Sequence, residues 1–520
     1  MAVDPSIQPR ADRLSLLLGP ATGLLKPSGA LLLGFSLWLL LGLCTGRWLA
    51  LALSCWSLVL LLLAMGIERR WLAVLPLPPL TVMAFAGFMR WGLGGFFLVA
   101  AGSHVRPDVK PWVVGLEPAQ ALGAVLYTSI LAVALLNRSW MRHFPPKPLG
   151  EDLRARLPWL TLLLGLFSLA YLGIGVGFGT LDRGWTNYVH WTTQLWRPDT
   201  LFIPFLRFKD LFYLLVPVAV VSAKRPGSLG RGWLPAVLIA ITLLSLLLAA
   251  GTGGRGLLLA PLVLILLGFW FTDLSVQSIR RLALAVLLFA LMFIPVMDAL
   301  RETSVFKATS SQHPLERVQV ISQGMRAASF KPETLSLIGR DLFGASDPYL
   351  FQPPGSLLSP VGNKRLQGLL FLWVPKHLYP QRPEINDGHL IAKEIMGKPG
   401  KGIVNGQHIW FPNVTFAADL YWRYRWAGVF LGCALFGLFY ALLCRLWYRW
   451  ASLSGGLFAL LLALYPATFF NGLPLRSLSE TVWNWSWDFP KYLIAMLVLS
   501  WLGECLYRWV VKSSPASTAS

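Results

Sequence analysis

Long apolar runs alternate with short polar connections along almost the whole chain, and this pattern predicts membrane-spanning helices. About 20 apolar residues is the length that an α-helix needs to cross the hydrocarbon core of a bilayer. The chain is therefore expected to be an all-α polytopic membrane protein with about twelve transmembrane helices. The apolar runs lie at 28–45, 48–67, 79–102, 116–136, 158–178, 204–222, 233–250, 256–273, 281–299, 426–446, 452–471 and 490–510.

The positions of arginine and lysine predict the orientation. With the N-terminus in the cytoplasm, every inner connection carries at least two basic residues, as in ERRW (68–71) and QSIRR (277–281), and this follows the positive-inside rule. An even number of spans also returns the C-terminus to the cytoplasm. The expected organisation is a cytoplasmic segment (1–27), transmembrane helices 1–9 (28–299), a large extracytoplasmic loop domain between helices 9 and 10 that carries the active-site residues (300–425), transmembrane helices 10–12 (426–510) and a disordered cytoplasmic tail (511–520).

Composition supports this class. Of the 520 residues, 55% are hydrophobic and only 13% are charged, about half the share of about 25% in soluble domains. The net charge of +21 fits basic inner loops and an anionic ligand; without a continuous basic face it does not indicate nucleic acid. The cysteines all lie within or beside apolar runs, so neither a disulfide framework nor a zinc site is expected.

A glycine-rich motif, GTGGRG (251–256), matches the G-x-G-x-x-G pattern of dinucleotide-binding loops. That pattern has meaning only after a strand and inside a βαβ unit, whereas this copy joins two predicted spans. What remains is a tight turn that presents Arg255 beside the first turn of a helix, where free N–H groups favour an anion. The alternative is that Arg255 reaches out to lipid phosphates.

A second candidate region is FLWVPKHLYPQRPEINDGHLIAKE (371–394). Lys376 and Arg382 suit phosphate binding, and Glu384 or His389 could activate a hydroxyl nucleophile. The alternative is an ordinary solvated loop.

A third region, NGQHIWFPNVTFAADLYWRYRWAG (405–428), is rich in aromatic residues. Trp410, Tyr421 and Trp422 fit an interfacial aromatic belt and would also suit stacking on sugar rings. Arg423 is expected just above the membrane.

Two further arginines are candidates for anion binding. Arg301 is expected on the other side of the large loop. Arg90 is the sole charge near the centre of its predicted span, which costs about 2.5–3.5 kcal/mol on insertion scales, so it should face the bundle interior or an aqueous cavity. The alternative is a misplaced span boundary, because PLPP (76–79) blurs the start of this span.

Several mechanisms lack their motifs. The outer segments contain no D-x-D pair for a metal-dependent glycosyltransferase, and the chain contains no P-loop for ATP-driven transport. Asp298 and Glu504 lie near the ends of predicted spans, and no acidic relay for proton coupling is expected.

Three motifs in order carry a resemblance to a known family. A turn ending in GGRG, a late loop with WVPKHLYPQRPE, and FPNVTFAADLYWRYRWAGVFLG leading into a span together resemble the bacterial Wzy-type polymerases. These are O-antigen or oligosaccharide repeat-unit polymerases, related to the O-antigen ligases. The resemblance covers about 250–432, and the family pattern usually has arginine at the position of Lys376.

The resemblance implies a multi-pass protein of the bacterial inner (plasma) membrane that transfers glycan from polyprenyl pyrophosphate to the hydroxyl of a lipid-linked repeat unit. The transfer would be inverting, at the outer face, and would need no metal or other cofactor. Expected partners are the polyprenyl-pyrophosphate-linked oligosaccharide and membrane lipid, with a chain-length regulator and a flippase as further candidates and no nucleic acid. The leaving pyrophosphate needs fixed positive charge, for which the candidates are Arg255, Arg301, Lys376, Arg382 and Arg90. Glu384 or His389 would be the base, and the sugar-binding candidates are Trp410, Tyr421, Trp422 and Arg423.

Two alternatives remain open. An O-antigen-ligase-type glycosyltransferase would move a finished glycan to another acceptor. A transporter or flippase for lipid-linked oligosaccharides would instead spread its polar residues along a pathway through the membrane.

Overall fold

The described part of the chain is helical apart from one small hairpin. In that hairpin, β1 (Ile403–Val404) pairs antiparallel with β2 (Gln407–His408). The predicted all-α class is therefore confirmed for this part of the chain, apart from the two short strands. This computed structural model describes residues 45–72, 74–75, 78–107, 109–137, 144, 150–177, 208–225, 228, 232–251, 255–269, 272, 333–351, 362–363, 366–371, 374, 378–379, 381, 391, 403–404, 407–408, 414–453, 456–465 and 476–513.

The chain is a multi-pass membrane protein. Six stretches of helix within the described residues are long and apolar enough to cross a bilayer. The predicted number of twelve spans is not established, because run 281–299 and all but the last residue of run 28–45 lie outside the described residues. The six stretches are Trp48–Ile67, Pro79–Ala100, Leu116–Leu136, Glu151–Ala170, Phe416–Ser452 and Leu478–Val511.

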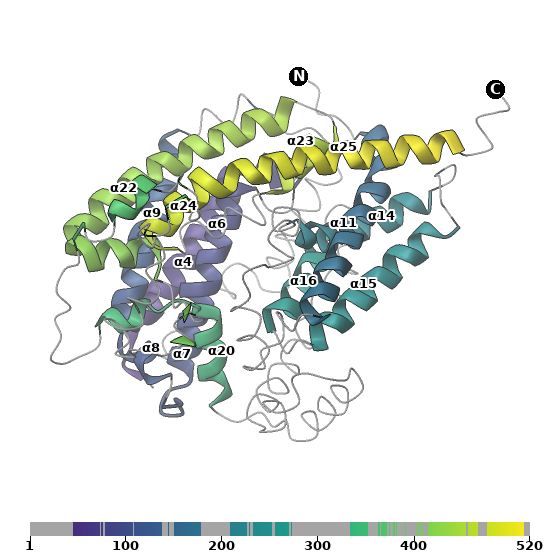
Figure 1. Cartoon of the computed structure of the whole chain (residues 1–520). Helices are drawn as coiled ribbons and strands as arrows, with labels where there is room; N and C mark the ends of the chain where they lie inside the picture. The colour runs from purple at the N-terminus through teal and green to yellow at the C-terminus, as the bar shows by residue number, and fades with distance from the viewer. Residues whose placement is uncertain are drawn as a thin grey trace.

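Two groups of helices stand side by side in Figure 1, and the purple, blue and green helices on the left form the first group. One of its spans is interrupted by a π-helix, η1, and one helix comes from the large loop segment, α20. Its elements are α4 (Trp48–Ile67), α5 (Arg69–Leu72), α6 (Pro79–Gly87), η1 (Phe88–Gly94), α7 (Gly95–Ala100), α8 (Lys110–Val114), α9 (Leu116–Leu136), α20 (Thr334–Phe343), the 3-10 helix η3 (Asp347–Phe351) and α22 (Phe416–Leu453), with a further 3-10 helix, η4 (Leu366–Phe371).

The second group lies on the right of Figure 1, in teal, and its buried side chains are mostly apolar. Its close contacts need small residues: a Cβ at Gly268 would lie 2.2 Å from the Leu214 carbonyl oxygen. The yellow C-terminal helix extends across both groups. The second group consists of α11 (Glu151–Gly177), α14 (Lys209–Ala223), α15 (Leu234–Gly251) and α16 (Arg255–Gly268). The C-terminal part of the chain adds α23 (Leu457–Leu464), α24 (Leu478–Trp483), the π-helix η8 (Asn484–Asp488) and α25 (Phe489–Ser513).

Helix α22 doubles back on itself at Arg425. This residue has φ 58° and ψ −157°, a left-handed conformation that is rare for a side chain with a Cβ. The rings of Phe416 and Phe436 lie 4.5 Å apart, whereas a straight helix would separate them by about 30 Å. α22 is thus a hairpin with a short arm (416–424) and a long arm (426–453), and the hydrophobic pattern places the start of the tenth span at the first residue of the long arm.

The apolar pattern and the helices agree in some places and differ in others. Runs 48–67 and 116–136 coincide with α4 and α9. Within the described part, run 452–471 covers the last two residues of α22 and then α23, which is eight residues long. Gly456 is extended immediately before this helix, and Pro466 follows it in the sequence; both residues oppose a longer helix.

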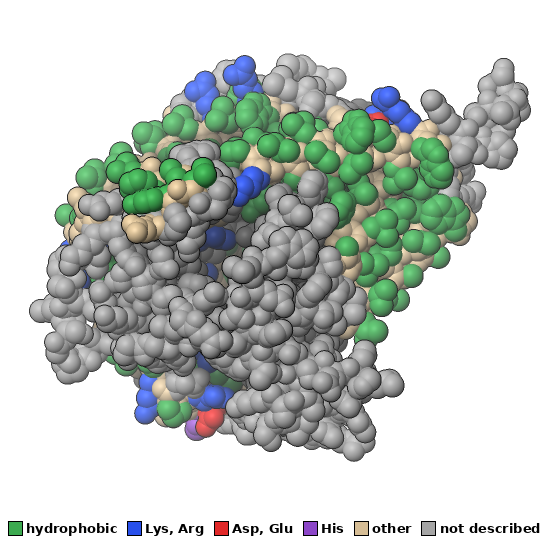
Figure 2. Space-filling view, in the orientation of Figure 1, with side chains coloured by type: hydrophobic (Ala, Val, Ile, Leu, Met, Phe, Trp, Pro, Cys, Tyr) green, Lys and Arg blue, Asp and Glu red, His purple; other side chains and the backbone are tan. Residues whose placement is uncertain are grey.

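Two segments predicted to be cytoplasmic meet at one end of the first group. The rings of Trp71, in ERRW, and Trp447, in RLWYRW, lie 4.9 Å apart. Figure 2 shows Lys and Arg side chains towards the upper and lower edges of the view and a broad hydrophobic surface between them on the right. This separation fits a membrane protein, while the side that faces the cytoplasm stays a prediction.

Candidate functional site

Arg90 lies in the π-helical part of its span and keeps an unsatisfied donor. Its side chain is half-buried, and its Nη1 atom is buried with no hydrogen-bond partner among the described residues. α20 packs closely beside it, since a Cβ at Gly94 would lie 2.8 Å from the Phe343 amide nitrogen. The span around Arg90 is thus covered by a helix from the large loop segment.

Gln120 of α9 holds this π-helix in place. Its Nε2 donates to the Trp91 carbonyl over 2.7 Å and to the Ser54 hydroxyl over 3.0 Å. There is no room for a side chain at Gly95, where a Cβ would lie 2.1 Å from the same Nε2. π-Helical turns inside α-helices are frequently found at functional sites, and this one sets the position of Arg90.

Asp347 supplies a buried negative charge from the large loop segment. Its side chain is 0% exposed, and it accepts hydrogen bonds from Thr415 N and Thr415 Oγ1, both at 2.8 Å. Burial raises the pKa of Asp347 to about 6, although the Thr415 bonds and the charge of Arg90 act in the opposite direction. Arg90 and Asp347 therefore interact electrostatically between a membrane span and the loop segment.

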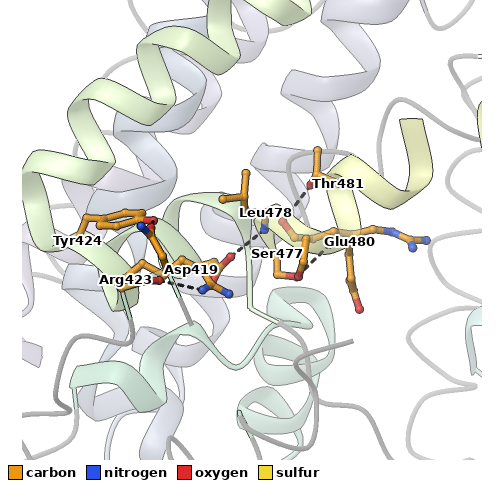
Figure 3. A network of polar contacts seen from close by, with 11 residues as sticks. Asp419, Arg423, Tyr424, Ser477, Leu478, Glu480 and Thr481 are labelled. Carbon is orange, nitrogen blue, oxygen red and sulfur yellow. Dashed lines mark hydrogen bonds and ion pairs between the residues drawn. The ribbon is translucent and has the colours of Figure 1, made fainter. Parts of the chain in front are cut away.

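A second buried pair, shown in Figure 3, joins the short arm of α22 to two other segments. Arg423 Nε donates to Asp419 Oδ1 over 3.0 Å, and the two side chains are 1% and 0% exposed. Arg423 Nη1 also donates to the Gly362 carbonyl over 3.1 Å, and Asp419 Oδ2 accepts from Leu478 N at the start of α24 over 2.8 Å. The pair fixes the short arm between the loop segment and the last membrane helix.

Glu68 is a third buried carboxylate, and it lies at the N-terminal end of α6. It accepts from Leu80 N over 3.0 Å and from Thr81 N over 2.7 Å, and the Tyr448 hydroxyl donates to it as well. Burial raises the pKa of Glu68 to about 7. The prediction treated this residue as part of a cytoplasmic connection; in the structure it caps α6, the helix that continues into the Arg90 π-helix.

Four of the predicted site residues lie within the described part of the chain: Arg90, Tyr421, Trp422 and Arg423. The ring of Tyr421 lies 4.9 Å from that of Phe351, and the Arg425 guanidinium lies 5.4 Å from its centroid. Trp422 is only 1% exposed, and Arg423 is committed to its ion pair. In this structure these residues contact other residues of the protein, and their role in sugar binding stays a prediction.

Arg255 is the first residue of α16, and α15 ends at Gly251. The GTGGRG motif thus joins two helices as expected, and a helix, not the strand of a nucleotide-binding unit, precedes it. The position of the Arg255 side chain lies outside the described part of the structure. The other candidates also lie outside the described residues: Arg301, Lys376, Arg382, Glu384, His389 and Trp410.

The buried carboxylates were missed by sequence reasoning, and one of them had a local signal. Asp419 and Arg423 stand at i and i+4, the spacing of a helical ion pair. Asp347 had none, because its partners Thr415 and Arg90 are distant in the chain. Within the described residues, no group of three or more His, Cys, Asp or Glu residues could hold a metal ion.

The arrangement offers a chemistry of fixed charges. Arg90, whose Nη1 has no hydrogen-bond partner among the described residues, lies beside a buried carboxylate where a membrane span meets helices of the large loop segment. A charge at such a depth marks a candidate site for a charged ligand. In comparisons with known proteins, the chain matches no protein-family model, no curated protein and no solved structure.

Proposed function

We propose that the protein is a Wzy-type polysaccharide polymerase of the bacterial inner membrane, which transfers glycan from polyprenyl pyrophosphate to the hydroxyl of a lipid-linked repeat unit at the outer face. The observation that carries the proposal is the buried Nη1 of Arg90, which has no hydrogen-bond partner in the part of the chain that the structure describes. Its position in the middle of an apolar span makes this charge expensive to keep. A protein that retains such a charge has a use for it, and an anionic leaving group is that use.

The proposed reaction makes this demand directly. The acceptor hydroxyl oxygen attacks the anomeric carbon, the bond from that carbon to the pyrophosphate oxygen breaks, and its electron pair leaves with the pyrophosphate. The charge that develops on the leaving oxygen is stabilised by fixed donors, each worth about 100- to 1000-fold in rate. Arg90 is one such donor, and Arg255, Arg301, Lys376 and Arg382 are candidates for the others.

The proton of the acceptor hydroxyl passes to a base, for which Glu384 and His389 are the candidates. Asp347 has a different role in this proposal. Both of its oxygens already accept hydrogen bonds from Thr415, so it orients Arg90 electrostatically and does not take up the proton. Tyr421, on the short arm of α22, is the sugar-binding candidate with a partly exposed side chain.

Purified protein tests the proposal. In detergent, without ATP or an ion gradient, the wild type should lengthen polyprenyl-pyrophosphate-linked repeats. Arg90→Ala should lower the rate by roughly 100-fold or more, and Arg90→Lys should recover only part of it, since lysine keeps the charge without the planar fork. The matched control is Arg156→Ala, which removes an arginine whose ion pair lies in α11 and α25. Full activity in folded Arg90→Ala would refute the role of this residue.

Products in cells distinguish a polymerase from a ligase. In cells that carry Arg255→Ala, loss of a polymerase leaves a single repeat unit on the final acceptor. Loss of a ligase leaves long polymer on the polyprenyl carrier.

Transport of a lipid-linked oligosaccharide is the second candidate, and one observation favours it. Buried polar groups extend along the second described span, from Glu68 at the start of α6 to Arg90 in η1, with the Tyr127 ring against Gly87 between them. A transporter would move a labelled lipid-linked sugar across vesicles without lengthening it. Chain growth in the detergent assay, where no compartments exist, would decide for the enzyme.

A further inference from the structure

Two segments that are distant in the sequence meet in a buried aromatic joint at one end of the first group. They are ERRW (68–71), at the end of α4, and RLWYRW (445–450), near the end of α22. The ring of Trp71 lies 4.9 Å from that of Trp447 and 5.2 Å from that of Tyr448, and the three side chains are at most 3% exposed. The exposed side chains that flank this joint therefore share one end of the first group.

The exposed side chains that flank the joint include four arginines, two from each segment. The one acidic residue of the two segments, Glu68, is 0% exposed and accepts hydrogen bonds from backbone N–H groups at the start of α6. The carboxylate is thus held inside the helix group, while the positive charges lie at the surface. Figure 2 shows Lys and Arg side chains towards the upper edge of the view, the edge near which α22 ends in Figure 1. The four arginines are Arg69, Arg70, Arg445 and Arg449.

The exposed face of α22 changes from apolar to basic as the helix approaches this end. Leu435, Leu438 and Leu442 are exposed. Arg445 and Arg449 continue the same face, because the spacing of three and then four residues is kept along the helix. Exposed leucines on a membrane-spanning helix lie in the hydrocarbon, and Arg445 follows Leu442 after a rise of about 4.5 Å. The arginines therefore lie at the boundary between hydrocarbon and lipid headgroups.

Helix α4 shows the same change from apolar to basic. Val59 and Leu62 are exposed on α4, and Arg69 and Arg70 follow about two turns after Leu62. Trp450, which is exposed beside the α22 arginines, is a residue type that is enriched at the level of the headgroups. Two helices that are joined by the aromatic contact thus bring arginine to the same boundary, each with an apolar surface directly behind it.

We propose that this basic end of the first group, defined by Arg69, Arg70, Arg445 and Arg449, binds the headgroups of anionic phospholipids. A guanidinium pairs with phosphate oxygens through two parallel hydrogen bonds, and each basic residue near a membrane surface strengthens the attraction to anionic lipid roughly fivefold. The acyl chains of the bound lipid lie along the exposed leucines. A lipid with a net negative charge fits both parts of this surface, whereas the choline group of phosphatidylcholine brings a cation that the arginines repel.

Photolabelling of the purified full-length protein in phosphatidylcholine nanodiscs tests the proposal. Two probes are compared, phosphatidylglycerol and phosphatidylcholine, each with a diazirine in the acyl chain close to the headgroup. Peptides that include 58–63 and 438–446 should be labelled at least about tenfold more by the phosphatidylglycerol probe. The exposed face of α15, in peptides that include 239–247, should be labelled equally by both. The comparison needs no sugar substrate, so it can fail independently of the proposed glycan transfer.

A double variant with one change in each segment assigns the preference to the arginines. Arg70→Gln combined with Arg449→Gln should reduce the preference for phosphatidylglycerol at these peptides to about twofold or less. Both residues are exposed, so the variant keeps the buried joint. The matched control combines Lys224→Gln with Arg508→Gln, which removes two exposed positive charges at the ends of α14 and α25 and should leave the preference unchanged.

Three outcomes would overturn the proposal. The first is an equal preference for phosphatidylglycerol on the exposed face of α15. The second is an unchanged preference in the folded double variant, or an equal loss in the control. The third is displacement of the phosphatidylglycerol probe by inorganic phosphate at constant ionic strength, which would mean that the arginines bind a soluble anion and that the apolar surface behind them has no part in binding.

Discussion

The two groups of helices solve the same problem, burial in a membrane, with opposite chemistry. The first group, around α4 to α9, buries Glu68, Asp347, Asp419 and Arg423 completely. In the second group, α11 and α14 to α16, the described buried polar side chains are hydroxyls such as Ser168 and Ser245. Charge is costly in a bilayer, so the first group is where this chain keeps charges for a purpose.

Helix termini explain how the first group can afford these charges. Each of its three buried carboxylates accepts a backbone N–H at the start of a helix: Glu68 from α6, Asp347 from Thr415 before α22, and Asp419 from Leu478 in α24. The first N–H groups of a helix have no partner within it and favour a negative charge. Interrupted helices bring these termini inside, as at the starts of α6, α22 and α24.

The largest expected loss of stability follows removal of Asp419. Asp419→Ala removes the carboxylate that is ion-paired with buried Arg423 and also removes the acceptor for Leu478 N, so the free energy of unfolding should fall by about 3–5 kcal/mol. Unfolding of purified protein in mixed micelles measures it. Asp152→Ala, an exposed position in the first turn of α11, is the control. A loss below 1 kcal/mol would mean that charge does not hold the first group together.

Glu68 should make the stability of the first group depend on pH. Its pKa is about 7 in the folded protein against an ordinary value of 4.5, so the folded state binds the proton more tightly. The stabilisation that the Glu68 carboxyl contributes is fully present below pH 4.5. It decreases as pH rises, by up to about 3 kcal/mol at pH 7 and above.

Apparent melting temperatures at pH 5 and pH 8 measure this dependence. Glu68→Gln cannot titrate, so it should show a flatter profile than the wild type, although it satisfies only one of the two N–H groups of α6. The pKa of Asp347 is also raised, from 3.8 to about 6, so this residue likewise makes stability decrease with rising pH. It remains in both proteins. Identical profiles for the variant and the wild type would contradict the assignment.

The contrast between apolar runs and buried charges also explains what the sequence could predict. Apolar length alone located α4 and α9 to the residue, because a bilayer demands a continuous run. It did not reveal the reversal at Arg425, because a residue with a Cβ rarely takes a positive φ and the apolar pattern carries no signal for one. Arg90 was predicted from its isolation in an apolar run. Its neighbours Asp347 and Gln120 were not, because they come from distant segments and only tertiary packing brings them together.

Steric changes should matter more than charges in the second group. Gly268→Ala places a Cβ 2.2 Å from the Leu214 carbonyl oxygen and 2.9 Å from Pro217 Cδ, and backbone at that distance cannot yield cheaply. We expect a loss of about 1–3 kcal/mol in the free energy of unfolding. Gly232→Ala is the matched control, since nothing lies within 4 Å of its Cβ position. Equal stability of the two variants would show that close packing does not distinguish this group.

The smallest effect is expected for the one ion pair described between α11 and α25. Arg156 Nη1 lies 2.7 Å from Glu504 Oε1, but the side chains are 32% and 23% exposed. Solvent screens such a pair, so Arg156→Ala should cost at most about 1 kcal/mol, part of it from lost contact with the Tyr507 ring, 5.8 Å away. The measurement is the same unfolding experiment, repeated in high salt, which should reduce the difference further. A loss as large as that of Asp419→Ala would mean that lipid, not water, surrounds this pair, and the contrast between a charged first group and an apolar second group would no longer hold.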